Sequence, residues 1–174
     1  FEIGAGSDVR IVAGCGIHNS CERKAQHDGI HEFFVREGAR MKYVEKHYGG
    51  GEGQGQRILN PRTVIEVEAG GIAELEMIQL KGVDRTHRDT LVRLHRNARL
   101  IVTERLLTHL DQEARSDITV DFVGEDSTAQ VISYELSMAL ALISVFVLSG
   151  TMSTSQIVGA QEQIWWFLPL APAF

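Results

Sequence analysis

Five potential metal ligands stand close together near the start of the chain, in the segment CGIHNSCERKAQHDGIH at residues 15–31. They are two thiols, Cys15 and Cys21, and three imidazoles, His18, His27 and His31. Thiolates and imidazoles are ligands of zinc, iron and iron–sulphur clusters. If the segment binds a metal, we expect iron or an iron–sulphur cluster, with Cys15, Cys21 and His27 as ligands. The alternative is a polar loop with a buried Cys15 and an incidental Cys21, because the spacing is that of neither a zinc ribbon nor a ferredoxin.

Other side chains suggest a different chemistry. Four glutamates alternate with apolar residues: Glu66, Glu68, Glu74 and Glu76. Two of them could serve as general acid and base, as in β-helical enzymes that cleave polysaccharides, or all four could form the solvated face of neighbouring strands. The remaining histidines are scattered through strand-like segments, so we expect surface or hydrogen-bonded side chains at His47, His87, His95 and His109.

Composition narrows the class of protein. A chain of 174 residues is long enough for one domain with its own core. Its net charge of −6 disfavours a sequence-independent nucleic-acid binder. Two cysteines do not indicate a disulfide framework, and no signal peptide is recognisable at the start. We therefore expect a cytoplasmic protein whose partners include neither nucleic acid nor a membrane.

The elements that would position these side chains form a repeat. An apolar run, a polar turn and a second apolar run occur four times, with turn markers at Gly38, Gly70, Asn97 and Asp126. Successive markers lie 27 to 32 residues apart, a spacing typical of solenoids. Within the runs apolar residues alternate with period two, which indicates strands. The pattern predicts an all-β parallel β-solenoid, with a β-sandwich or jelly roll as the alternative.

The last part of the chain differs from the repeat. Residues 136–160 contain no charged side chain, and alternation stops at about Tyr134. The apolar core of this segment, residues 138–148, is shorter than the roughly 20 residues of a membrane span. We therefore expect a β-helix core over residues 1–133. Residues 134–174 would be an atypical apolar segment: a helix from about Glu135 to Leu148, an interface element, or uncertain sequence.

In the order of its motifs, the chain resembles the SufB/SufD family of the SUF system for iron–sulphur cluster assembly. The resemblance covers residues 8–133. It is carried by VAGC at 12–15, by the pattern His-x-Gly-x-x-Glu at His27, Gly29 and Glu32, and by VREGARMKY at 35–43. The segments at 60–82 and 98–133 continue it.

The resemblance implies a right-handed parallel β-helix that acts as a scaffold and not as an enzyme. It further implies a transient iron–sulphur cluster or iron as the bound group. The implied partners are a SufC-type ATPase, a second subunit in a homodimer or a SufB/SufD-type heterodimer, and a cysteine-desulfurase system that donates sulphur. Two other functions stay open, a carbohydrate-active β-solenoid enzyme with paired carboxylates and a purely structural, self-assembling β-solenoid.

Overall fold

The computed structural model describes residues 1–108 and 111–135. The chain divides into two units, Phe1–Glu135 and Leu136–Phe174, and every described residue belongs to the first. The helix expected from about Glu135 to Leu148 therefore lies outside the described residues, except for Glu135 itself, which ends the strand Thr128–Glu135. Across the described ranges, no helix is long and apolar enough to cross a membrane.

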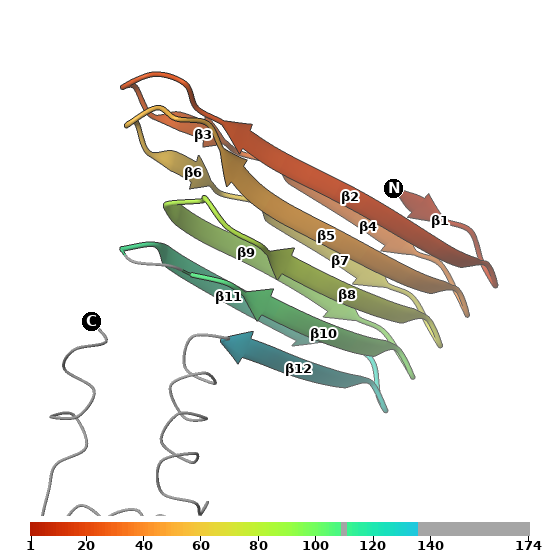
Figure 1. Ribbon diagram of the computed structural model, residues 1–174. Coiled ribbons are helices and arrows are strands. Elements are labelled where there is room, and N and C mark those ends of the chain that lie inside the picture. The colour runs from red at the N-terminus through yellow and green to blue at the C-terminus, as the bar shows by residue number, and fades with distance from the viewer. Residues whose placement is uncertain (109–110, 136–174) are drawn as a thin grey trace, which may run out of the picture. The chain divides into compact units, whose positions relative to one another are not determined.

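The first unit is built from strands that form two sheets (Figure 1). One sheet has the order β12-β10-β8-β5-β2, and the other has the order β1-β4-β7-β9-β6-β3, with β11 paired to β9. The strands are β1 (Glu2–Ile3), β2 (Asp8–His18), β3 (Ala25–His27), β4 (Ile30–Val35), β5 (Arg40–Gly50), β6 (Arg57–Leu59), β7 (Arg62–Val67), β8 (Ile72–Gln79), β9 (Arg85–Leu94), β10 (Arg99–Leu106), β11 (Glu113–Phe122) and β12 (Thr128–Glu135).

All strand pairs of the described residues are parallel, so each strand contacts its equivalent one coil later. Arg40 at the start of β5 pairs with Asp8 of β2 on one side and with Ile72 of β8 on the other. Ile72 then pairs with Arg99 of β10, and Arg99 with Thr128 of β12. This register confirms the predicted all-β parallel β-solenoid, and it excludes the antiparallel hairpins of a sandwich or jelly roll for this part of the chain.

The turns at one end of the coils stack on one another. Gly38 and Gly70 have φ angles of 62° and 68°, and Asn97 and Asp126 both have a φ of 57°. Glycine, asparagine and aspartate tolerate this left-handed conformation better than other residues. The first three markers donate their N–H groups to the next coil: Gly38 to Ala69 O (3.0 Å), Gly70 to Arg96 O (2.9 Å) and Asn97 to Glu125 O (2.9 Å). The four predicted turn positions are therefore confirmed, and Gly6, with a φ of 65°, is a fifth that the sequence did not single out.

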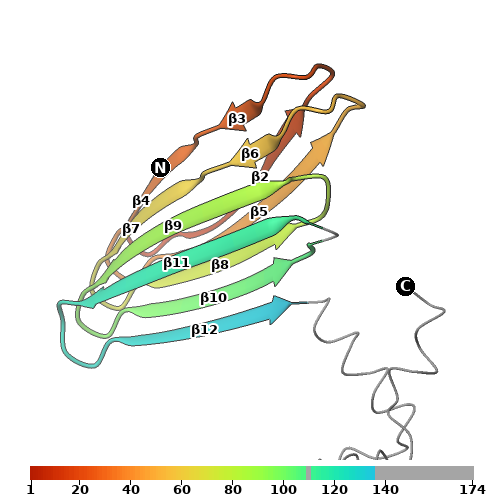
Figure 2. The ribbon, with the colours of Figure 1, turned by 90° about the vertical axis from the view of Figure 1, so that its left-hand side faces the viewer.

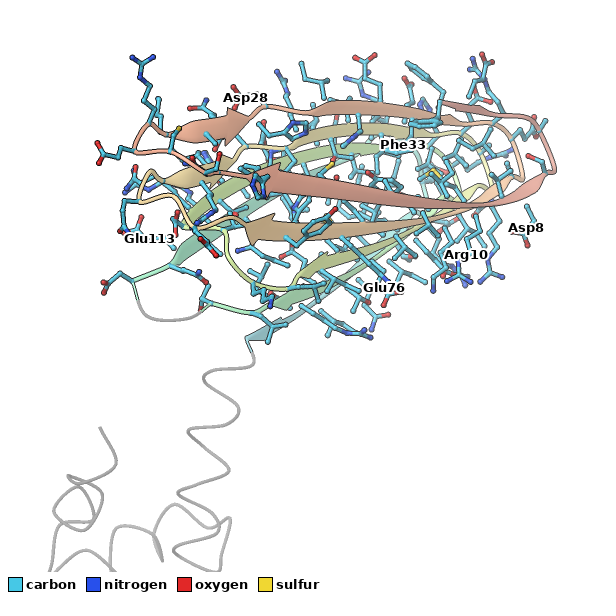
Figure 3. All side chains as sticks on the ribbon, turned by 45° about the horizontal axis from the view of Figure 1, so that its top comes forward. Asp8, Arg10, Asp28, Phe33, Glu76 and Glu113 are labelled. Carbon is cyan, nitrogen blue, oxygen red and sulfur yellow. The ribbon has the colours of Figure 1, made fainter. Side chains whose placement is uncertain are left out.

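The two sheets face each other, and their inward side chains form the core (Figure 2). Near the stacked turns this core is apolar; its main cluster includes Met41, Tyr43, Ile65, Leu75 and Leu100. A smaller cluster of Ile17, Leu59 and Val83 lies toward the opposite end of the strands. In Figure 3, Asp8 marks the end with the stacked turns and Glu113 marks the opposite end. Polar residues occupy the core positions between the two clusters.

Candidate metal centre

The core positions between the two apolar clusters carry charged and polar side chains, which we call the polar layer: Glu45, His47, Gln79, Arg88 and Glu104. Each of these side chains is almost completely buried. Strand alternation puts them inside, because Glu45 and His47 continue the inward series that begins with Met41 and Tyr43 on β5. Burying charge is costly unless the groups pair with one another or with a ligand, so the contacts within the layer decide its chemistry.

Three side chains of this region form a group with the composition of a metal site. Cys15 of β2 pairs in register with His47 of β5, and Glu45 lies two residues before His47 on the same strand. One ligand atom from each of Cys15, Glu45 and His47 lies within 4.8 Å of the other two. Glu45 and His47 are fully buried, and Cys15, on the first coil, is partly exposed. The group is therefore enclosed on the core side and reachable through Cys15.

The Glu45 carboxylate has one crowded oxygen and one free oxygen. Oε1 accepts a hydrogen bond from the Tyr43 hydroxyl at 3.0 Å, and it lies 3.4 Å from His31 Nδ1 and 3.3 Å from His47 Nε2. Oε2 has no hydrogen-bond partner, and neither has His47 Nε2 nor His31 Nδ1. Burial raises the pKa of Glu45, but His47, Arg88 and His31 outweigh it and hold that pKa below its usual value. Glu45 is thus favoured as a carboxylate, and its Oε2 is free of hydrogen bonds.

His47 is held from its other side by Arg88. An amino group of Arg88 lies 3.0 Å from His47 Nδ1, and the second amino group lies 3.2 Å from Glu104 Oε1. Ser116 also donates to Glu104 Oε1, at 2.6 Å. Because a guanidinium has only donors, Nδ1 must accept, and the proton of the neutral imidazole is on Nε2, facing Glu45. The layer thus holds two carboxylates, those of Glu45 and Glu104, and one guanidinium, a balance that favours a bound cation.

A nucleophilic role for the same three residues does not fit this geometry. Burial, and then the negative charge of Glu45, raise the pKa of the Cys15 thiol. Activated cysteines instead have lowered pKa values and a neighbouring base that can take the proton. The basic nitrogen of His47, Nδ1, is occupied by Arg88. The arrangement is therefore suited to binding a metal ion and not to attacking a substrate.

Of the three ligands predicted from the sequence, the structure brings only Cys15 into this group. Cys21 lies in the loop after β2, exposed, with its Sγ 3.4 Å from Asn19 Oδ1 and 3.8 Å from Arg23 O. His27 ends β3 and is exposed. Neither belongs to a group of three ligands among the described residues. Cys21 and His27 are close to Cys15 in the sequence but do not join it in this group, because β2 ends at His18 and the chain turns there toward β3.

Sequence reasoning did not recognise Glu45 and His47 as candidate ligands. The signal was present in YVEKH, where Glu45 and His47 take alternate inward positions, and in the distance from Cys15 to His47, which equals one coil. For the other histidines, the structure shows His87 Nε2 2.8 Å from Asp117 Oδ2 and His95 Nε2 2.9 Å from Glu66 Oε1. His109 lies outside the described residues.

The four glutamates considered as an acid–base pair are divided between two places. Glu66 and Glu68 belong to β7 and the turn after it, and Glu74 and Glu76 belong to β8 in the other sheet. Each carboxylate has a cationic or imidazole neighbour: His95 for Glu66, Arg36 for Glu68, Arg40 and Lys42 for Glu74, and Lys42 and Arg105 for Glu76. These ion pairs connect neighbouring coils across the outer faces.

The chain was compared with models of known protein families. A family model described as NADH dehydrogenase matches residues 126–174. The match begins at the last stacked turn, includes β12 and continues past the described residues. No solved structure matches the chain.

This match corrects the family predicted from the sequence. The matched family is NADH dehydrogenase and not SufB/SufD, so the assignment to the SufB/SufD family is wrong. The predicted function and partners that depended on this assignment are wrong as well. They are the iron–sulphur assembly scaffold, the SufC-type ATPase, the SufB/SufD-type dimer and the cysteine-desulfurase system. The physical reason lies in the motifs that carried the resemblance. Any stack of parallel coils requires strands with alternating apolar residues and small residues in the turns. The order of these motifs therefore indicates a β-solenoid and does not identify one family.

Proposed function

We propose that the β-solenoid is a binding module that holds one divalent transition-metal ion, zinc or ferrous iron, at Cys15, Glu45 and His47. The observation that carries this proposal is a pair of fully buried atoms that make no hydrogen bond, Glu45 Oε2 and His47 Nε2, beside the Cys15 thiol. Unpartnered buried polar atoms are rare and need an explanation such as an ion. A cation at this position would engage these atoms and balance the additional carboxylate of the layer.

The ligand types define the class of ion. A thiolate and an imidazole suit zinc and ferrous iron, and a carboxylate is a further ligand of both. Calcium and magnesium prefer oxygen ligands alone, so this donor set disfavours them. Three protein ligands leave a coordination position for water or for a partner molecule. In this proposal the module binds an ion and does not itself catalyse a reaction.

The match at residues 126–174 supports a proposal about the context of the module. Because the matched family is NADH dehydrogenase, we propose that the solenoid acts beside an NADH dehydrogenase segment of the same chain and with respiratory-complex subunits as partners. Co-purification of such subunits with the tagged full chain supports this assignment, and recovery of the chain alone overturns it.

Metal titration of the purified, reduced full chain tests the proposed site. We expect one Co²⁺ per chain with a thiolate-to-cobalt absorption band, and displacement of Co²⁺ by Zn²⁺. Cys15→Ser should remove the absorption band, and Glu45→Gln should weaken binding at least about tenfold. Cys21→Ser is the matched control, because it removes the other thiol and should leave the spectrum unchanged. Absence of binding, or loss of the band in Cys21→Ser with retention in Cys15→Ser, overturns the proposal.

A further inference from the structure

We propose that Arg88 is a latch on the metal centre, and that it competes with the ion for His47. This inference rests on the proposed function and describes how occupancy of that site is controlled. Its starting point is the contact on the far side of the imidazole, where an amino group of Arg88 lies 3.0 Å from His47 Nδ1. Arg88 belongs to β9, on the sheet that faces β5, so the latch crosses the interior of the solenoid.

The hydrogen bond from Arg88 to His47 Nδ1 and the binding of a metal ion to His47 Nε2 exclude each other. In the state described here, Arg88 donates to Nδ1, so the ring carries its proton on Nε2. A metal ion can bind Nε2 only when that nitrogen has a free lone pair, and the ring proton is then on Nδ1. A metal-bound histidine donates this proton to a carboxylate, a carbonyl oxygen or water. Arg88 can accept no proton, so binding of the ion requires Arg88 to leave Nδ1.

The interior provides a second position for Arg88. Its other amino group already donates to Glu104 Oε1 at 3.2 Å, and its Nε has no hydrogen-bond partner. A shift of the guanidinium toward Glu104 would keep the buried charge paired and could engage Nε as well. Through the exchange the His47 ring keeps a single proton, which moves from Nε2 to Nδ1. The latch therefore has a closed state on His47 and an open state on Glu104.

Two substitutions of Arg88 differ in whether the new side chain can accept a hydrogen bond from His47. Glutamine provides a carbonyl oxygen that can accept from Nδ1–H and so supports the metal-binding form of His47. Lysine has donors only, so it retains the competition. We expect Arg88→Gln to bind Zn²⁺ about ten- to a hundredfold more tightly than the wild type, the range typical for outer partners of metal ligands. Arg88→Lys should not gain affinity.

The experiment combines a Zn²⁺ competition titration against a chromophoric chelator with ¹⁵N NMR of the histidine rings in the ion-free full chain. The NMR spectrum should show an unprotonated Nδ1 for His47 in the wild type and a protonated Nδ1 in Arg88→Gln. If Arg88→Gln does not fold, Arg88→Gln/Glu104→Gln removes the buried ion pair as a whole and takes its place.

The outcomes separate this inference from the proposed function. If the wild type binds Zn²⁺ and Arg88→Gln binds no more tightly, the latch is overturned and the site stands. Equal tightening by Gln and Lys also overturns the latch, because donor character then has no role. If neither protein binds Zn²⁺, the proposed function is overturned. Binding by Arg88→Gln alone upholds the latch and overturns the metal site of the native chain.

Discussion

Glu45 is the residue on which the chemistry of the polar layer depends. Its carboxylate is buried and accepts a hydrogen bond from the Tyr43 hydroxyl. Its negative charge also acts on two neighbouring titratable groups, the Cys15 thiol and the Tyr43 hydroxyl. Burial, followed by the charge of Glu45, raises the pKa of both the Cys15 thiol and the Tyr43 hydroxyl. In the folded protein both groups therefore hold their protons more tightly than in the unfolded chain.

This proton retention predicts a loss of stability in alkali. A raised folded-state pKa stabilises the protein below the unfolded pKa, about 8.5 for cysteine and about 10 for tyrosine, and the contribution is lost as pH rises further. The free energy of unfolding, measured by urea denaturation of the ion-free protein, should fall with increasing slope between pH 8 and pH 11. In Glu45→Gln the slope should be smaller, because one of the causes of both shifts is absent. An unchanged slope in this variant would contradict the assigned role of Glu45.

At the scale of elements, the stacked turns determine where each coil begins. Gly70 is a clear case: its φ is 68°, and a Cβ at this position would meet no atom within 4 Å. The requirement for glycine is therefore conformational and not a matter of space. Asn97 and Asp126 fulfil the same requirement on the following coils with the two side chains that tolerate it best.

Gly70→Val should accordingly destabilise the solenoid by about 1–2 kcal/mol, through backbone strain alone. Gly14→Val is the matched control. Gly14 lies in β2 at an exposed position, has no positive φ, and a Cβ there would also meet nothing within 4 Å. Valine suits a strand, so the control should change stability by less than about 0.5 kcal/mol. Urea denaturation of both variants measures the difference, and equal values would contradict a strained turn at Gly70.

The sequence allowed the coils to be predicted because their signal is local. Gly38, Gly70, Asn97 and Asp126 show the turn chemistry directly, and alternation within each run indicates strands. The metal centre could be predicted only in part, because it depends on register. Cys15 was identified from its type, whereas Glu45 and His47 become candidate ligands only when β5 is placed beside β2 in the correct register. A shift of one residue would have turned both outward.

At the scale of the whole molecule, the coils differ in how many neighbours they have. β5 lies between β2 and β8, and β8 lies between β5 and β10, whereas β12 pairs only with β10 among the described residues. In a solenoid each coil is stabilised mainly by the coils next to it. Two residues of the polar layer, Glu45 and His47, belong to β5, which has a paired strand on each side.

Hydrogen exchange should reveal this difference as a gradient. Backbone amides of β5 and β8 should exchange most slowly, and those of β12 should exchange at least about tenfold faster, because β12 pairs on one side only within the described part of the chain. Mass spectrometry of peptides from residues 40–50, 72–79 and 128–133 measures the rates. Uniform protection in all three peptides would show that the solenoid opens as one cooperative unit instead.

The similar offset between successive coils also has a consequence for how the chain folds. Joining a strand to its partner closes a loop of 27 to 32 residues at every step. The entropic cost of closing such a loop is about 3 kcal/mol, and it differs by only about 0.2 kcal/mol between the shortest and the longest. The entropic cost of adding a coil is therefore nearly the same for every coil. The slow event is the pairing of the first two coils, after which each new strand finds a complete template and growth proceeds coil by coil at a nearly even rate.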